Sequence, residues 1–292
     1  MAHRHFAARG FPGVQFTGID IAPLPPAMRA DDDMSWRFVQ HDLRKTPLPF
    51  REAEFGLIMV KDMSLCIGDV IHQQNLMNEY LRILKPGGIL ELWDGDHSLR
   101  MLLPHAPPEE KGEDEEMEHA IAMGTYTLTP QTPLAAPQNP FFQDYNSWIA
   151  KALEARNLTP MPCTLAQASL HQESELIEID SRRLAIPLGS VRWEREGVGP
   201  GAAKDIARGK EREKAKVLTA GQAALRRTAL LTAVQFIESL EGVLREVSGK
   251  GQDEWDRWYG AMMADLLKGN GTSWGECLEV GAWWARKKKA PS

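Results

Sequence analysis

Four short apolar runs recur through the first hundred residues, and their spacing constrains the fold more than any other feature of the chain. They cover residues 14–19, 36–42, 55–61 and 87–93 and are rich in the β-branched and aromatic residues typical of strands. Between the last two runs, apolar residues follow a helical period and end at a Lys-Pro-Gly-Gly turn. Strands that are apolar throughout and separated by helices imply a parallel sheet covered on both faces. The sequence therefore predicts an α/β protein with a doubly wound sheet.

The rest of the chain divides into two further regions after a core region of residues 1–103. Residues 104–140 are acidic and rich in proline, which predicts a partly disordered surface insertion, with a lid over a ligand as the alternative. Residues 141–292 complete the domain with late strands and C-terminal helices. The expected elements there are a helix over 142–158, a strand region over 174–189 and helices over 223–247 and 253–269. Residues 273–289 fit either a capped helix or a final strand.

Composition and charge exclude several classes of protein. The net charge of −6 argues against a surface built to hold polyanions, so we expect no nucleic-acid partner. The basic ending WWARKKK leaves nucleic-acid contact as an alternative to a solvated tail or a nuclear address. No run approaches the roughly 18 apolar residues of a membrane-spanning helix. Three widely spaced cysteines predict a reducing compartment, the cytoplasm, with the nucleus as the alternative.

Acidic residues end the first two predicted strands. In open parallel sheets, ligands bind beyond the carboxyl ends of the strands. Asp20 ends the first run, where a carboxylate can accept both hydroxyls of a ribose. Asp42 ends the second run and is followed by Leu43, a pair that could hold the edge and face of an adenine. The alternative for Asp20 is a cap for a following helix.

Three motifs carry a resemblance to a known family. GID ends the first run, HDLRKTPLPF joins the second run to the third, and LKPGG precedes the fourth. This succession resembles the class I S-adenosylmethionine-dependent methyltransferases, and within them the fungal small-molecule and regulator-like members. The alternative is another doubly wound nucleotide-binding domain, such as a nicotinamide enzyme, whose second strand also ends in an acid.

The resemblance implies a cofactor, a reaction and a set of binding residues. S-adenosyl-L-methionine would be the cofactor and a small organic molecule the methyl acceptor. Asp20 with Ile21 would bind the ribose, and Asp42 with Leu43 the adenine. Lys61, the last residue of the third run, would complete the cofactor site beside the acceptor.

The glycine-rich loop of that family has no counterpart in the printed sequence. In relatives it joins the first strand to the first helix, ahead of the GID strand, and its backbone holds the methionine part of the cofactor. Residues 197–205 contain glycines, but no predicted strand leads into them. We therefore expect a sheet that lacks its first strand because the gene product is shortened at its N-terminus, with two alternatives: the neighbouring strands pair directly, or another segment fills the gap. The loss predicts impaired methyl transfer, with an inactive binding or regulatory protein as the alternative.

No catalytic residue can be assigned from the sequence. Lys61 ends the third run and Asp62 follows it, while Asp94, Asp96 and His97 follow the fourth. Of these, His97 is the most easily poised to deprotonate an acceptor hydroxyl near neutral pH. Loop and capping roles are the alternative for all five. One histidine and two aspartates on a single turn are too few to predict a metal site.

Overall fold

The computed structural model describes residues 13–23, 36–68, 70–104, 115–196, 217–268 and 271–289. Its strands are β1 (Phe16–Asp20), β2 (Trp36–Gln40), β3 (Phe55–Lys61), β4 (Leu84–Gly95), β5 (Arg100–Leu102), β6 (Tyr126–Thr127), β7 (Leu134–Ala135), β8 (Leu176–Pro187) and β9 (Glu276–Lys287). Its helices are α2 (Val70–Ile83), α3 (Glu115–Met123), α4 (Pro140–Glu154), η1 (Pro162–Thr164), α5 (Ala166–Gln172), α6 (Arg192–Glu196), α8 (Ala220–Ser239), α9 (Glu241–Ser248) and α10 (Gln252–Lys268).

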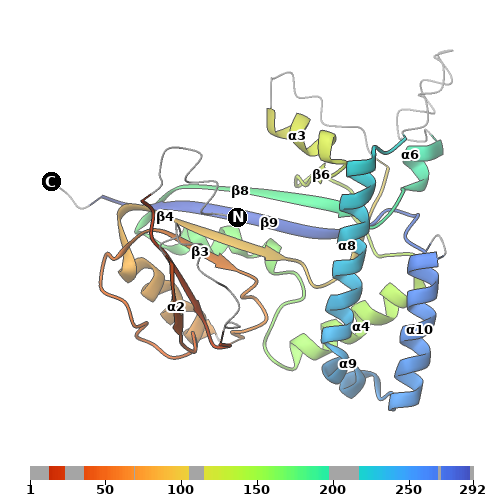
Figure 1. Ribbon diagram of the computed structural model, residues 1–292, viewed down its shortest axis with the longest axis horizontal. Coiled ribbons are helices and arrows are strands. Elements are labelled where there is room, and N and C mark those ends of the chain that lie inside the picture. The colour runs from red at the N-terminus through yellow and green to blue at the C-terminus, as the bar shows by residue number, and fades with distance from the viewer. Residues whose placement is uncertain are drawn as a thin grey trace.

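The predicted α/β class is confirmed, and the main sheet is mixed. Seven strands form it in the order β3-β4-β9-β5-β7, with β8 paired to β9 and β6 to β8. Only β3 and β4 pair in parallel, whereas β9 runs antiparallel to β4, β5 and β8. The long strands β8 and β9 form the axis of the molecule in Figure 1. Within the main sheet, the expectation of parallel strands thus holds only for β3 and β4, because the C-terminal segment enters this sheet as an antiparallel strand.

The ambiguous C-terminal segment is a strand because its burial follows a period of two. From Glu279 to Ala285, alternate residues are buried and the residues between them are half-buried. This pattern matches a strand with one face more deeply buried than the other. It excludes the alternative of a helix capped by Ser273 and Glu276.

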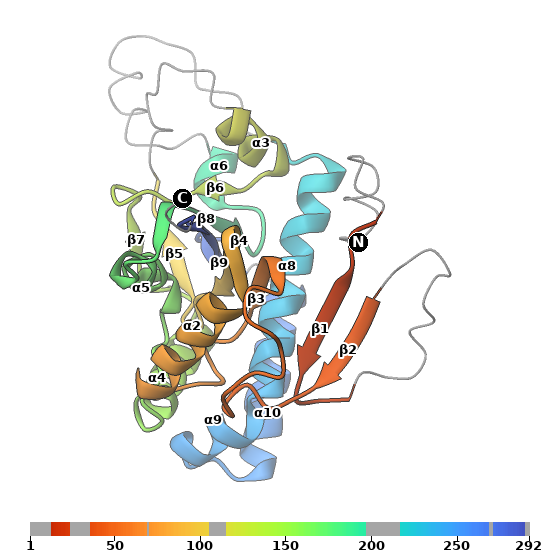
Figure 2. The same cartoon turned by 90° about the vertical axis from the view of Figure 1, so that its left-hand side faces the viewer.

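The first two strands form a separate sheet. β1 and β2 pair in parallel, with Asp20 opposite Gln40, and make no ladder with β3. Figure 2 shows this pair standing apart from the strands of the main sheet. Among the described residues, no strand bridges β1 and β3 and the two do not pair directly. The sheet is therefore interrupted at the position where the missing strand was expected.

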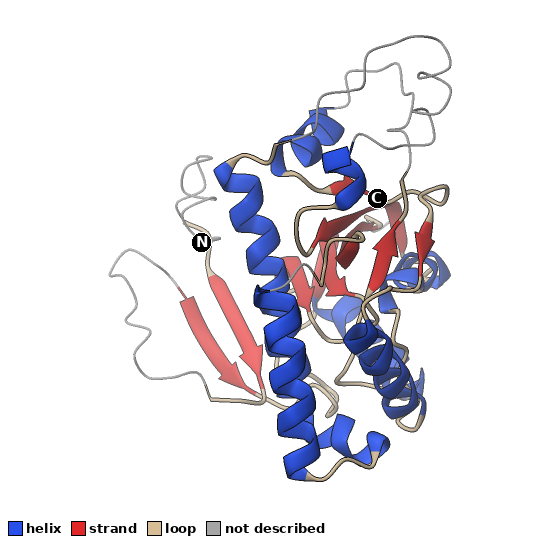
Figure 3. Ribbon diagram, turned by 90° about the vertical axis from the view of Figure 1, so that its right-hand side faces the viewer, coloured by secondary structure: helices blue, strands red, loops and turns tan. Residues whose placement is uncertain are grey.

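Two hydrophobic cores hold the main sheet. One surrounds α2 and α5 and includes the fully buried side chains of Leu84, Leu90 and Trp283. The other joins α4, α8, α9 and α10 to the ends of β8 and β9, around Ile149, Ile237 and Met262. Figure 3 shows α8 as the long helix that runs through the centre of that view. The cover on both faces that the sequence predicts is incomplete, because Met59 of β3 and Trp93 of β4, which share one face, are 55% and 44% exposed.

Two sequence expectations change in detail. The helix expected over 223–247 begins earlier, with Thr219 and Gln222 forming a capping box, and divides into α8 and α9 at Leu240. The LKPGG turn lies inside β4: Phe55 pairs with Leu84 and Leu57 with Ile89, so residues 85–88 loop out of the ladder. Gly87 has φ of 78°, a left-handed conformation that favours glycine.

The acidic, proline-rich stretch is described only in part. Residues 105–114 lie outside the described residues, while α3, β6 and β7 form from the remainder. The glycine-broken segment 197–205 also lies outside them. Within the described ranges, no helix has the length and apolar character needed to cross a membrane.

Candidate functional site

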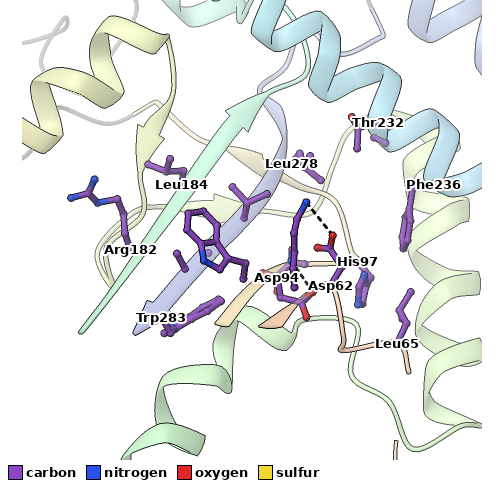
Figure 4. A pocket seen from close by; sticks show the side chains of 18 of the residues that line it. Asp62, Leu65, Asp94, His97, Arg182, Leu184, Thr232, Phe236, Leu278 and Trp283 are labelled. Atoms are coloured by element: carbon purple, nitrogen blue, oxygen red, sulfur yellow. Dashed lines mark hydrogen bonds and ion pairs between the residues drawn. The ribbon is translucent and has the colours of Figure 1, made fainter. Parts of the chain in front are cut away.

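A cavity of about 870 Å³ lies between one face of the main sheet and helix α8. Strands β3, β4, β8 and β9 form its floor, and Figure 4 shows Leu184 and Leu278 on this side with Thr232 and Phe236 of α8 opposite. Its walls are mainly apolar, and most of its charged groups lie where β3 and β4 end, with Arg182 of β8 apart from them. This combination is typical of sites for small organic molecules.

The polar end of the cavity is organised by Asp94. One carboxylate oxygen accepts hydrogen bonds from the Ser64 hydroxyl at 2.8 Å and from the Gly95 backbone N–H at 2.8 Å. The other oxygen accepts the Ser64 backbone N–H at 3.1 Å. Ser64 Oγ also lies 2.8 Å from Nε2 of His97. A continuous chain of hydrogen bonds therefore runs from Asp94 through Ser64 to His97.

Hydrogen bonds hold the backbone of His97 at its N–H and at its carbonyl. Its N–H donates to the Pro160 carbonyl at 2.8 Å, and its carbonyl accepts the Tyr145 hydroxyl at 2.7 Å. Its ring stacks on Phe236 with centroids 5.5 Å apart. Burial lowers the pKa of His97 below its usual value, although the negative charges of Asp94 and Asp62 oppose this shift. The imidazole is therefore neutral at pH 7.

A buried ion-pair network lies under the same loop. The Asp96 and Glu279 side chains are fully buried, and Arg183 Nη2 lies 3.2 Å from a carboxylate oxygen of each. Arg100 pairs with Glu279 as well, through Nε at 2.6 Å. Asp96 also accepts the Cys163 backbone N–H at 2.9 Å. These contacts make Asp96 an anchor of the loop, which agrees with the structural alternative for this residue.

The predicted cofactor residues Asp20 and Asp42 lie at the same edge of the small sheet. The His41 N–H donates to the Asp20 carbonyl at 2.9 Å, so the ends of β1 and β2 are adjacent. Asp20 is exposed, and its Oδ1 accepts the Ala22 N–H at 2.9 Å. Both Asp42 oxygens accept hydrogen bonds from the Arg44 guanidinium at 2.9 Å. These bonds lower the pKa of Asp42 to about 2.

The other predicted cofactor residues lie in different surroundings. The Ile21 side chain is exposed, whereas Leu43 packs against the core around α2. Lys61 lines the cavity, and its Nζ lies 3.5 Å from Asp62. Lys61 alone of the five is a cavity residue, and the cofactor roles of all five stay predictions.

Cys66 lies in the loop that follows β3. Burial raises the pKa of its thiol, the negative charges of Asp20 and Asp94 raise it further, and the positive charge of Arg44 lowers it.

Comparison with known proteins bears on the N-terminal part of the chain. Residues 1–92 match the family model described as a methyltransferase domain. This match supports the resemblance carried by the GID, LPF and LKPGG motifs, over about a third of the chain. No curated protein sequence matches significantly.

Solved structures give distant similarities. The PH0226 protein of Pyrococcus horikoshii is 20% identical, with 32% of this chain and 44% of that chain covered and a TM-score of 0.23. The [4+2]-cyclase SpnF is 12% identical, with 99% and 72% covered and a TM-score of 0.40. Phosphoethanolamine N-methyltransferase 2 of Haemonchus contortus, bound to phosphomonomethylethanolamine and S-adenosylhomocysteine, is 12% identical, with 98% and 46% covered and a TM-score of 0.39. The chain thus corresponds to less than half of the Pyrococcus and Haemonchus chains.

Much of the cavity comes from outside the methyltransferase-domain match. Phe236 and Thr232 belong to α8, and Leu278 belongs to β9, far along the chain from the matched residues. Sequence reasoning missed them because their apolar side chains look like ordinary core positions. Ser64 was also missed, although it follows β3 at the point where ligand-binding residues are expected. Within the described ranges, no cluster of His, Cys, Asp and Glu side chains could hold a metal ion.

Proposed function

We propose that this protein is an S-adenosylmethionine-dependent methyltransferase that acts on a small organic acceptor. The observation that carries the proposal is the match of residues 1–92 to a methyltransferase domain. Strands β3 and β4 of that segment end at the polar side of an 870 Å³ cavity. Ligands bind at this edge of α/β sheets, and the cavity volume suits a small organic molecule.

The residues present fit the cofactor in part. Oδ2 of Asp20 accepts no hydrogen bond from any described residue, so it can accept a ribose hydroxyl. Ile21 is exposed beside it and can pack against the nucleoside. Asp42 would have to exchange its two bonds to Arg44 for bonds to adenine. When bound, the cofactor supplies an electrophilic methyl group on a positively charged sulfur.

The chain's own residues would position the acceptor. Leu65, Phe236 and Leu278 line the cavity with apolar surface. Lys61 and Asp62 stand at the end of β3 and line the same cavity. Methyl transfer depends chiefly on aligning the acceptor atom with the methyl carbon and sulfur, so the cavity would contribute by orienting the acceptor.

The alternative of an inactive binding protein is favoured by one observation. Arg44 holds both oxygens of Asp42, and this pair blocks one of the two carboxylates expected to contact the nucleoside. Binding of S-adenosylhomocysteine without transfer of labelled methyl to any acceptor tested would support this alternative. The sequence-based prediction of impaired transfer is tested by the same measurement.

Titration calorimetry of the full chain with S-adenosylhomocysteine tests the proposal. We expect binding in the wild type and about tenfold weaker binding in Asp20→Asn, because a charge-assisted bond to ribose becomes a neutral one. Asp253→Asn is the matched control, an exposed carboxylate at the start of α10. The absence of both heat and a shift in Tm with wild-type protein would refute the proposal.

Two of the four basic residues in the ending WWARKKK are engaged within the protein, which supports a small-molecule partner over nucleic acid, while Lys288 and Lys289 are exposed. Arg286 donates to Glu178 and to the Gly87 carbonyl, at 2.7 and 3.0 Å. Lys287 donates to the Leu81 carbonyl at 2.6 Å. These cations tie β9 to β4 and α2, which reduces the charge they offer to phosphates. We retain the cytoplasm as the proposed location.

A further inference from the structure

The hydrogen bonds around Ser64 fix the position of one proton on His97. Asp94 is an acceptor for three donors, one of which is the Ser64 hydroxyl. A serine hydroxyl has a single proton, so Ser64 Oγ can only accept in its contact with His97. The proton of this second bond must therefore come from Nε2 of His97, 2.8 Å away.

Nδ1 of His97 consequently carries a lone pair. A neutral imidazole has one protonated and one unprotonated nitrogen. Burial lowers the pKa of His97, which keeps it neutral. No described residue donates a hydrogen bond to Nδ1, although His97 lines the cavity. The structure thus presents a basic nitrogen in a cavity without a proton donor of its own.

The groups around the imidazole keep that nitrogen basic and oriented. Asp62 and Asp94 are the charged groups that face it from the ends of β3 and β4, and Lys61 is paired with Asp62. From α8 the contact is the apolar ring of Phe236, and from α4 it is the Tyr145 hydroxyl on the His97 carbonyl. The two carboxylates would stabilise an imidazolium, so a proton can be taken up transiently.

The cavity walls indicate the kind of molecule that would donate to this nitrogen. Leu65, Leu99, Phe236 and Leu278 line the same cavity as His97 with apolar surface, and Figure 4 shows the His97 ring on the side of the cavity where Leu65 and Phe236 lie. A flat apolar molecule with one hydroxyl group satisfies both the walls and Nδ1. A phenolic hydroxyl has an ordinary pKa near 10, so an imidazole can take its proton during the reaction. The hydroxyl of an aliphatic alcohol is too weakly acidic for this transfer.

We propose that Nδ1 of His97 accepts the hydroxyl proton of a mainly apolar phenol or enol, which is the methyl acceptor of this protein. This inference rests on the proposed function. As the acceptor oxygen bonds to the methyl carbon of the sulfonium donor, the carbon–sulfur bond breaks and its electron pair goes to sulfur. The hydroxyl proton passes to Nδ1, so a methyl ether, a thioether and an imidazolium result. The imidazolium then returns its proton to water.

The tautomer of His97 is the first test, and it needs no activity. The full chain with ¹⁵N-labelled histidine is observed at pH 8, and the His97 signals are those missing from His97→Gln among the eight histidines. We expect Nε2 to be protonated and Nδ1 to be unprotonated. A protonated Nδ1 in the neutral ring would overturn the proposal.

Ligand discrimination is the second test. The probes are 1-naphthol and 1-methoxynaphthalene, which differ in the hydroxyl proton. We expect wild-type protein to bind 1-naphthol about fivefold more tightly, as one hydrogen bond implies, and the naphthol to shift the Nδ1 signal. In His97→Gln, which can keep the bond to Ser64 but lacks Nδ1, the preference should disappear. In His97→Asn, whose amide oxygen can occupy the Nδ1 position and accept the hydroxyl proton, part of the preference for 1-naphthol should return.

The outcomes separate this inference from the proposed function. Equal binding of the two probes to wild type, or an unchanged preference in His97→Gln, would overturn the role of His97. Failure of S-adenosylhomocysteine to bind, with the naphthol preference intact, would refute methyl transfer while leaving the hydroxyl-binding role of His97 standing.

Discussion

Ser64 Oγ lies 2.8 Å from Nε2 of His97 and donates its own proton to Asp94 at 2.8 Å. The three residues come from the ends of two neighbouring strands, and only the middle one has a hydroxyl that can both donate and accept. The Asp94 carboxylate can only accept, so it takes the Ser64 proton, and His97 must then donate from Nε2. In this way the serine selects the Nε2-protonated tautomer of the histidine.

Removing the Ser64 hydroxyl should release that tautomer. In Ser64→Ala, nothing holds the proton on Nε2, so we expect the Nδ1-protonated form of His97 to appear in the ¹⁵N spectrum. Ser64→Thr retains a hydroxyl and should keep the wild-type tautomer. If Ser64→Ala shows the wild-type spectrum, Ser64 does not position the His97 proton.

Acidification should destabilise the protein partly through His97. Its pKa is lower in the folded than in the unfolded chain, where it is about 6.5, so the unfolded chain binds a proton first as the pH falls. The free energy of unfolding should drop as pH falls below 6.5 and level off below the folded pKa. Urea denaturation between pH 7.5 and 5 should show a smaller drop in His97→Gln. An identical pH dependence in both proteins would contradict the assignment.

Arg226 should be essential to the junction of α8 with the segments before it. It is buried and binds Glu194 through two bonds of 2.7 and 2.9 Å, and it also donates to the Gly124 carbonyl. Arg226→Met removes the two charge-assisted bonds that this guanidinium gives to the buried Glu194 carboxylate, so we expect a loss of about 3–5 kcal/mol in urea denaturation. The double variant Arg226→Met with Glu194→Gln should recover part of this loss. A larger loss in the double variant would mean that charge pairing is not the cause.

Two glycines should respond oppositely to alanine. Gly275 has φ of 117°, and a Cβ there would lie 2.5 Å from the Leu102 carbonyl oxygen. Gly275→Ala should cost at least about 2 kcal/mol through backbone strain and this clash. Gly260 lies inside α10 with open space at its Cβ, so Gly260→Ala should add up to about 1 kcal/mol. Thermal unfolding of both variants measures the difference, and equal Tm values would contradict it.

Local patterns in the sequence were enough to find most of the elements. The apolar period of 70–84 predicts α2, and the alternation from Ile177 to Leu188 predicts β8, because side-chain periodicity reports directly on a covered face. The acids at the ends of β1 and β2 also lie at one edge, as parallel strands require. These features depend on residues that are close to one another in the sequence, within one or two helical turns or between successive strands.

The sequence by itself determined the α/β class and where the first strands end, and it marked His97 only as a candidate base with a loop or capping role as the alternative. The tertiary structure alone decided that β9 joins β4 and β8, that α8 closes the cavity, and that Ser64 orients His97. Those relationships join residues far apart in the chain through packing and single hydrogen bonds. Periodicity cannot encode them, because it records only whether a side chain is covered and not which residue covers it.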